Sequence, residues 1–546
     1  MISVLSTNIT SPLGFTTEQN YQAVLTGTSA LKRYEGMWGL PEPFAASLFS
    51  EEQKAALALD GFTRFEALAI HSVREALSQT QLDVASPRVV LIISTTKGNV
   101  EVLGDTTQEG RYFPSKAAQT IADALGISTK PIVVCNACVS GLSTQLLANN
   151  LLSAGLYDYA IVVGAEVQSK FIVSGFQSLK AVSDEPCRPF DIERIGLNLG
   201  EAAATIIFAR TSNKENWCLV DGATCNDAFH NISPSPKADG CTKAIEAVMK
   251  DWDKSQLATV CVHGTATLYN DQMESVAIER TGLSEIPLSA LKGYYGHTMG
   301  AAGVLETILT MRATDDGIVL GSKGFTEVGV SGKVSINNEI QQTNKSSFLK
   351  LLSGFGGSNV AALFSKTTDN RLQTTDLILH KTHTIKLSST GGKTLTDIYK
   401  QQIGNYPKFY KMDILTRLAF VASELLIKEM GETQEEPAII LFNHSSSLVA
   451  DRQYLKTICD ADNFFPSPSV FVYTLPNITT GEIAIRNHFQ GETSFYILPE
   501  KDEALMQQIH EATLNATNAK SAISGWIDAE SDTKFECEIS NYIIQN

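Results

Sequence analysis

The segment PIVVCNACVSGLSTQ, residues 131–145, places two cysteines where a predicted strand meets a predicted helix. Pro131–Val134 is a short apolar run typical of a buried strand, and Gly141–Ala154 has helical spacing. A thiolate at Cys138 would lie near the helix N-terminus, where unpaired backbone N–H groups and the helix dipole favour negative charge and lower a thiol's pKa. Cys135 falls on the strand side, so Cys138 is the candidate for thiol chemistry.

The C-x-x-C spacing alone leaves three interpretations open. A zinc site would need two further ligands, and the sequence has no second C-x-x-C. A thioredoxin-like redox pair fits a strand followed by a helix, but that fold is much smaller than this domain. Two buried structural cysteines are the third interpretation, since free cysteine is among the most buried residue types.

Length and composition describe a large globular protein. The chain has 546 residues, which predicts two or more domains, and its 43% apolar and 19% charged residues are ordinary for a globular chain. A formal charge of -16 argues against nucleic-acid binding, which depends on lysine and arginine neutralising phosphates. The nine cysteines are odd in number and mostly isolated, which does not resemble a disulfide framework. We expect a reduced, cytoplasmic protein.

Targeting and membrane signals are not expected. Met1–Gly14 lacks the basic start and the long apolar run of a signal peptide. The apolar runs, such as Val89–Ile93 and Tyr159–Val163, have the length of a strand and are far shorter than a bilayer span. The sequence therefore predicts no membrane span.

Strand-like runs alternate with helical patterns along the chain, which indicates an α/β fold. A polar stretch, SKTTDNRLQTT at 365–375, then has the composition of a linker. We expect one domain over residues 1–366, a linker over 367–376 and a second domain over 377–546.

Three later motifs narrow the interpretation. They are HGTATLYNDQME at 263–274, KGYYGHTMGAAG at 292–303 and SGFGGSN at 353–359. Singly, each is weak: a lone histidine is often a satisfied core residue, and GFGGSN lacks the spacing of a nucleotide-binding loop. Together with NACVSG at 136–141, and in this order, they resemble the elongating β-ketoacyl-acyl-carrier-protein synthases of the thiolase superfamily. The resemblance covers roughly residues 1–366.

The resemblance implies a fold and a reaction. The fold is the thiolase fold, two related βαβαβαββ halves in a five-layer α/β/α/β/α domain. Cys138 would be the acylated nucleophile, while His263 and His297 would stabilise the enolate formed when malonyl-ACP loses carbon dioxide. Backbone N–H groups of Cys138 and Phe355 would form the oxyanion hole, with Phe355 also gating the acyl pocket. Cys135 would then be a structural bystander.

The family pattern also implies roles for neighbouring residues. Lys292 matches a catalytic lysine that pairs with Glu274, although an ordinary surface ion pair is the alternative. Lys180 matches a basic position used for docking the carrier protein, with a plain solvated lysine as the alternative. The remaining candidates are substrate-binding Thr265, Thr267, Phe176 and Ser233, and structural support from Asp271 with Glu274.

The chain departs from the family beside the expected acyl pocket. STTKGN at 94–99 puts Lys97 near a position that is usually apolar, which leaves the preferred chain length open. Ile232 stands where the family often has a threonine near the pantetheine, leaving Ser233 as the remaining hydroxyl.

The C-terminal region resembles the first half of a synthase again. The matching stretches are MDILTRLAFVASELL at 412–426, AIILFNHSSS at 438–447 and TLPNITTGEIAIRNHFQGE at 474–492. Pro114 precedes Cys138 by 24 residues, and the same step from Pro476 reaches Glu500 rather than a cysteine. With no second histidine-bearing half to follow, we expect a degenerate, non-catalytic α/β half-repeat with a structural or docking role.

The sequence thus predicts a condensing enzyme that extends an acyl chain held on Cys138, using malonyl-ACP. The alternative is a non-elongating subunit like the chain-length factors, which usually lack the nucleophilic cysteine. We expect no metal and no cofactor beyond the phosphopantetheine arm of the carrier protein. The expected partners are acyl carrier protein and a second synthase subunit, in a homodimer or a heterodimer. Fatty-acid, polyketide and polyene chains remain undistinguished.

Overall fold

Residues 2–210, the first half of the N-terminal domain, build a five-stranded sheet. The computed structural model describes residues 2–108, 110–210, 216–366, 378–389, 393–431, 436–517 and 519–545. In spatial order the strands are β1 (Ile2–Thr10), β8 (Ala202–Arg210), β6 (Tyr159–Glu166), β4 (Val89–Ser94) and β5 (Ile132–Val134). The last three are parallel and almost wholly buried, as expected of strands covered on both faces.

A second sheet repeats this arrangement. Its strands are β9 (Cys218–Asn226), β16 (Ser358–Ser365), β15 (Ser347–Gly354), β10 (Leu257–Cys261) and β11 (Pro287–Ser289). The directions match strand for strand: the first two pairings are antiparallel and the next two are parallel, as in the first sheet. The two halves therefore share one topology, and one pairing between Ser3 and Cys218 joins their sheets.

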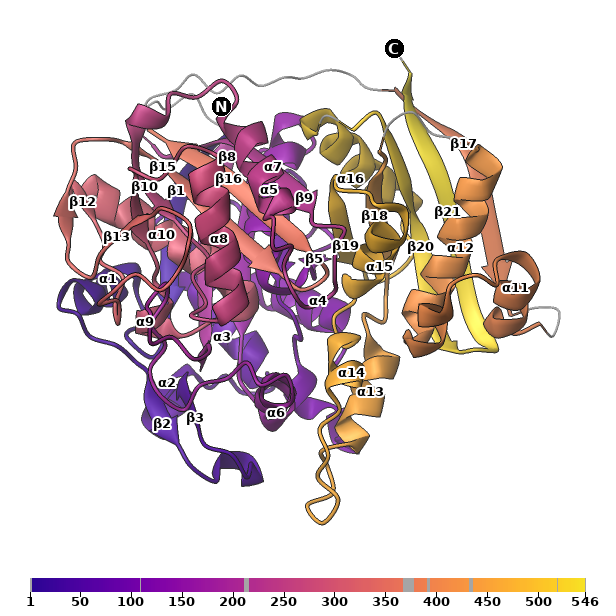
Figure 1. The fold of residues 1–546 in the computed structure, drawn as a ribbon, viewed down its shortest axis with the longest axis horizontal. Helices are drawn as coiled ribbons and strands as arrows, with labels where there is room; N and C mark the ends of the chain where they lie inside the picture. Colours follow the sequence, from indigo (N-terminus) through magenta and orange to yellow (C-terminus); the bar gives the residue numbers. More distant parts are fainter. Residues whose placement is uncertain are drawn as a thin grey trace.

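Helices form the other three layers. The central layer holds α5 (Ser140–Ser153) and α10 (Ala302–Asp315), which cross with their backbones close together: a Cβ at Gly141 would lie 2.9 Å from the Gly303 nitrogen. The outer layers are α3 (Arg64–Leu77) with α4 (Pro114–Leu125), and α7 (Asp239–Met249) with α8 (Leu268–Arg280). The predicted five-layer thiolase fold is confirmed (Figure 1).

The C-terminal region continues the first sheet. Its strands are β19 (Thr493–Ile497), β18 (Ala438–Asn443), β20 (Ser521–Ser531), β21 (Lys534–Gln545) and β17 (Ile378–Ser388). Read from β17 to β19, their order and directions are those of β1 to β5, so this region has the topology of one synthase half. The expected linker over 367–376 and the boundary at 377 lie outside the described residues.

The C-terminal sheet joins the first half edge to edge. β19 pairs antiparallel with β5, with Tyr496 opposite Val134 and Ile497 opposite Val133. α12 (Ile414–Met430) and α15 (Ile478–Asn487) cover one face of the sheet and α16 (Glu503–Ala516) the other. Figure 1 shows this region on the right, with α13 (Leu448–Lys456) and α14 (Pro468–Val472) extending below it. Across the described parts of the chain, no helix is both long and apolar enough to cross a membrane.

Candidate active site

Cys138 lies at the sharp connection between β5 and α5. It belongs to the short 3-10 helix η4 (Ala137–Val139), directly before α5 begins, and it is 8% exposed. Ala137 has a φ of 49°, an uncommon value for a residue with a side chain. This backbone turns the thiol away from the strand and into the interior, where the two histidines lie. Cys135, on the strand side, is fully buried and also a free thiol.

Two backbone N–H groups donate toward the Cys138 thiol, its own and that of Phe355. This is the pair expected to form the oxyanion hole. Burial nevertheless raises the pKa of the Cys138 thiol to about 12, and Lys292 and these two N–H groups offset it only in part. The lowered pKa expected at a helix N-terminus is therefore wrong for the resting site, because desolvation outweighs the stabilising groups.

His263 and His297 converge on Cys138 from the second half. His263 follows β10, and His297 lies between α9 (Lys292–Tyr295) and the short helix η6 (Met299–Ala301). Their rings meet edge to face with centroids 5.1 Å apart. One ring nitrogen from each and the Cys138 sulfur all lie within 4.8 Å of one another. The three residues therefore form one buried cluster.

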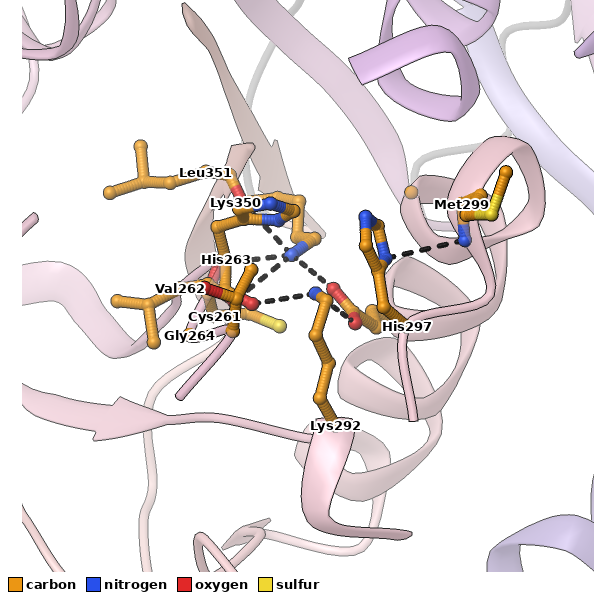
Figure 2. Close-up of polar contacts among 12 residues, drawn as sticks. Cys261, Val262, His263, Gly264, Lys292, His297, Met299, Lys350 and Leu351 are labelled. Atoms are coloured by element: carbon orange, nitrogen blue, oxygen red, sulfur yellow. Dashed lines mark hydrogen bonds and ion pairs between the residues drawn. The ribbon is translucent and has the colours of Figure 1, made fainter. Parts of the chain in front are cut away.

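The ring nitrogens are placed to serve a substrate. The backbone N–H of Met299 donates to Nδ1 of His297 at 3.3 Å, so the proton of a neutral ring lies on Nε2 (Figure 2). That Nε2, and Nδ1 of His263, are buried without a hydrogen-bond partner among the described residues. Burial and the charges of Lys292 and Lys350 hold both histidine pKa values well below 6.5, so both rings are neutral at neutral pH. His297 is thus a neutral N–H donor.

Lys292 belongs to a buried ion cluster rather than to the predicted pair. Its Nζ lies 2.8 Å from Glu306 and donates to the carbonyl oxygen of His263 at 2.6 Å. Lys350, with a fully buried side chain, binds the other oxygen of Glu306 at 2.6 Å. In Figure 2 both ammonium groups point to the backbone beside His263. The predicted pairing of Lys292 with Glu274 is wrong, because Glu274 instead accepts from the backbone N–H groups of residues 263 and 264, each at 2.7 Å.

Two buried carboxylates hold the loop that carries His263. Besides the bonds that Glu274 accepts, Asp271 accepts from the backbone N–H groups of Thr265 at 2.9 Å and of Phe190 at 2.7 Å. The Thr265 and Thr267 hydroxyls, the expected pantetheine contacts, lie 2.9 Å apart beside this loop. Burial raises the pKa of Glu274 to about 7. Both acidic residues therefore fix backbone, as expected from the motif.

The other predicted residues lie in three places. Phe176 and Phe355 stack with centroids 6.0 Å apart and line a small cavity next to Cys138. Ser233 lies in the loop after β9, where its backbone N–H donates to His230. Lys180 is on the surface, 78% exposed in its side chain and paired with Glu42 at 3.1 Å. Of these residues, only Phe176 and Phe355 lie next to the buried Cys-His-His cluster.

The Cys-His-His cluster also has the ligand types of a three-ligand metal site. One observation counts against that use. Lys292 and Lys350 already lower the histidine pKa values by their positive charge, and the same charge disfavours a bound cation.

Comparisons with known proteins agree with this geometry. Residues 2–214 match the model of the β-ketoacyl synthase N-terminal domain and residues 218–326 that of the C-terminal domain, together more than half of the chain. The chain is 26% identical over 412 residues to 3-oxoacyl-(acyl-carrier-protein) synthase 2 of Vibrio cholerae, covering 67% of this chain and 99% of the relative. It is 27% identical over 352 residues to the ketoacyl synthase alpha subunit of the Streptomyces glaucescens tetracenomycin polyketide synthase, covering 57% and 83%.

Solved structures agree in fold. A β-ketoacyl synthase from Burkholderia phymatum covers 67% of this chain and 99% of its own, with a TM-score of 0.61 and 22% identity. A PfaC keto synthase-chain length factor covers 100% of this chain and 78% of its own, with a TM-score of 0.79 and 14% identity. The chain belongs to the β-ketoacyl synthase family. It is a condensing enzyme of the 3-oxoacyl-ACP synthase type.

Sequence reasoning missed Glu306, Lys350 and the contacts that the C-terminal region makes with the site. The signal for the first two was a charged residue inside an apolar run, GVLETILT at 303–310 and FLKLL at 348–352. The amide of Asn477 donates to the carbonyl of Phe355 at 2.8 Å, so the C-terminal region holds the GFGG loop. Nothing in the local sequence pattern indicated that contact.

Proposed function

We propose that the cluster catalyses decarboxylative condensation of an acyl group on Cys138 with malonyl-ACP. The convergence of the Cys138 sulfur and two histidine nitrogens within 4.8 Å, in a buried site with unpaired ring nitrogens, carries this proposal. The retained cysteine and the assembled histidine pair also favour an elongating enzyme over the non-elongating, chain-length-factor-like subunit.

The first half-reaction loads the acyl group. The Cys138 sulfur attacks the thioester carbonyl, and the new C–S bond forms as the pantetheine thiol leaves with the proton that Cys138 gives up. The backbone N–H groups of Cys138 and Phe355, which donate toward the thiol, would stabilise the oxyanion of the tetrahedral intermediate. A neutral His263, with a ring nitrogen within 4.8 Å of the sulfur, would accept the thiol proton on the way.

The second half-reaction uses the histidines as donors. The malonyl thioester carbonyl would accept N–H groups from His263 and His297, so that the enolate is stabilised as carbon dioxide leaves. The enolate carbon then attacks the acyl carbonyl and the C–S bond breaks. Cys138 leaves as a thiolate and takes a proton from solvent to return to the thiol. Glu306 neutralises only one of the two positive charges of Lys292 and Lys350. A net positive charge therefore remains beside the developing anion.

The hydroxyls of Thr265 and Thr267 lie beside the histidine loop and are the proposed contacts of the phosphopantetheine arm. That arm arrives on the carrier protein, and the proposed chemistry uses no other cofactor.

The test separates the two half-reactions. Acylation is followed by intact mass after mixing with an acyl-pantetheine thioester, and decarboxylation by carbon dioxide release from malonyl-ACP. Cys138→Ala should abolish acylation, whereas Cys135→Ala should keep it. His297→Ala should slow decarboxylation by about 10² to 10³ but change acylation less. Labelling that follows Cys135, or equal loss of both steps in the folded His297 variant, would contradict the assignment.

We also propose that the acyl carrier protein docks beside Lys180. This chain carries a charge of -16, so an acidic carrier needs a local basic contact, and the Lys180 side chain is exposed near α6 (Lys170–Ser178), which carries Phe176. Lys180→Glu should raise KM for acyl-ACP and spare small pantetheine thioesters. Lys333→Glu, another exposed lysine paired with a glutamate, is the matched control. An equal effect on both substrates would contradict docking.

The C-terminal region is proposed to take the place of a partner subunit. The family usually dimerises by pairing the strand before the cysteine helix, and here β19 pairs antiparallel with that strand, β5. Glu500, in the loop after β19, forms an exposed ion pair with Lys130. A carboxylate in that setting fits a structural rather than a catalytic copy.

A further inference from the structure

The cavity beside Cys138 is closed by residues from both regions of the chain. The N-terminal domain contributes Lys97, Ile172, Phe176 and Phe355. The C-terminal region contributes Phe471 and Leu475. Its volume is about 10 Å³, which is room for one water molecule. An acyl chain extending from Cys138 therefore meets this wall at once.

A buried ion pair lies in the wall. The Nζ of Lys97 is 2.9 Å from Oδ1 of Asp451 and also donates to the carbonyl of Thr474, 377 residues along the chain. The side chains of Lys97 and Asp451 are 3% and 14% exposed. Asp451 is held in turn by the hydroxyl of Ser447, at 3.3 Å. Removing one partner of such a buried ion pair is costly, because the remaining charge stays buried without its partner.

A second cavity lies on the far side of this pair. It is also about 10 Å³, is lined by Val100, Leu103, Tyr112 and Leu448, and shares Thr96 and Lys97 with the cavity at Cys138. Asp451 lines the second cavity only. Lys97 therefore borders both spaces, and Asp451 borders the second.

Phe471, another residue of the cavity wall, is held in place by close packing. The ring of Phe471 lies against Gly175, where an added Cβ would come 2.0 Å from Cε2 of that ring. It also meets the rings of Phe176 and Tyr454 at centroid distances of 5.5 and 5.1 Å. Figure 1 shows α14, which carries Phe471, below the C-terminal sheet and beside α13. Because this ring cannot withdraw easily, the ion pair is the part of the wall whose removal would open a path.

We propose that the Lys97–Asp451 pair limits the enzyme to short acyl chains, and that the C-terminal region thereby sets the substrate's length. This rests on the proposed acylation of Cys138. The pair acts as a partition: it ends the acyl cavity near the thiol and keeps the second cavity, whose lining mixes apolar residues such as Val100 and Leu103 with polar ones such as Ser445, out of reach. An acetyl or butyryl group would fit with a small shift of Phe355, whereas an octanoyl group would have to pass through the partition.

The experiment uses the full chain and a series of acetyl, butyryl, hexanoyl and octanoyl pantetheine thioesters, with acyl-Cys138 measured by intact mass. The combined Lys97→Ala and Asp451→Ala variant removes both charges together, so neither is left buried alone. It should raise octanoyl transfer relative to acetyl transfer by about tenfold or more. The combined Lys97→Met and Asp451→Leu variant loses the charges but keeps the volume, and should keep the short-chain profile.

A refilling variant tests the second cavity directly. Leu448→Trp in the double-alanine background should remove the octanoyl gain. If the double-alanine chain does not fold by circular dichroism, the combined Lys97→Ser and Asp451→Ser variant takes its place. Unchanged length profiles, equal octanoyl and acetyl transfer by the wild type, or an equal gain in the volume-retaining variant would overturn the partition. Absence of acylation from every thioester would instead contradict the proposed function, and this inference with it.

Discussion

At Cys138, burial and the surrounding positive groups act on the thiol in opposite directions, and burial prevails. With the pKa raised to about 12, only a small fraction is thiolate at neutral pH, and that fraction rises about tenfold for each pH unit up to the pKa. In the proposed mechanism, the arrival of the substrate and proton transfer to a neutral ring nitrogen complete the activation.

This predicts the pH dependence of alkylation. In a Cys459→Ser background, which removes the exposed cysteine, the rate of iodoacetamide labelling at Cys138 should keep rising between pH 7 and pH 9.5 without a plateau. Peptide mass spectrometry measures it site by site. A plateau below pH 8 would show a thiolate stabilised by the helix terminus, against the burial argument.

The shared carboxylate Glu306 is the second residue whose charge matters. Burial raises its pKa, but the charges of Lys292 and Lys350 lower it below 4.5 overall. Its stabilising effect is therefore complete above the pKa of about 4.3 in the unfolded chain and is lost as pH falls through the lower folded value.

Glu306→Gln leaves two buried ammonium groups without their carboxylate. We expect the free energy of unfolding to fall by about 3–5 kcal/mol, measured by urea denaturation at pH 7. Lys333→Ala, which breaks the exposed pair with Glu285, should cost no more than about 1 kcal/mol. A loss as small for Glu306→Gln would show that the cluster is hydrated and not strongly coupled.

At the scale of elements, the C-terminal strand β19 is tied to the connection that carries the nucleophile. Asn136, two residues before Cys138, accepts the backbone N–H of Phe495 at 2.8 Å, and Cys135 donates to the Phe495 carbonyl at 3.1 Å. The register of β19 against β5 and the position of Cys138 are therefore set together.

Asn136→Ala should leave the Phe495 N–H buried without an acceptor. We expect a loss of about 1–3 kcal/mol in stability and faster hydrogen exchange at the Phe495 amide. Ser128→Ala, which removes an exposed hydroxyl bond to Ala85, should stay within about 0.5 kcal/mol. Unchanged exchange at residue 495 would show that water replaces the asparagine.

The same elements show what sequence could and could not predict. The strand-to-helix position of Cys138 and the two histidine motifs were readable, because each is local. The partner of Lys292 was not readable. Glu274 belongs to a recognised motif, whereas Glu306, which pairs with the lysine, lies on α10 in a stretch that the sequence shows only as an apolar run. Lys97 meets Asp451 across 354 residues, and no local pattern encodes such a contact.

At the scale of the whole molecule, one continuous sheet runs from the second half through the first half into the C-terminal region. An exposed strand edge with unpaired N–H and C=O groups invites pairing with another chain. In this protein the edge of β5 is occupied by β19 of the same chain. The β5 edge is thus already paired within one polypeptide.

The full chain should therefore be a monomer of about 59.2 kDa by light scattering at micromolar concentration. Deleting residues 377–546 should uncover the β5 edge together with apolar contacts such as that of Phe471 with Gly175, so the shortened chain should dimerise or aggregate. Any soluble shortened chain should still acylate Cys138, and with less discrimination by length, because Asp451 and Phe471 are gone. The opposite result would be a full chain with twice this mass and a shortened chain that stays monomeric. The dimer would then depend on the C-terminal region and not on a free β5 edge, so β19 would not replace a partner.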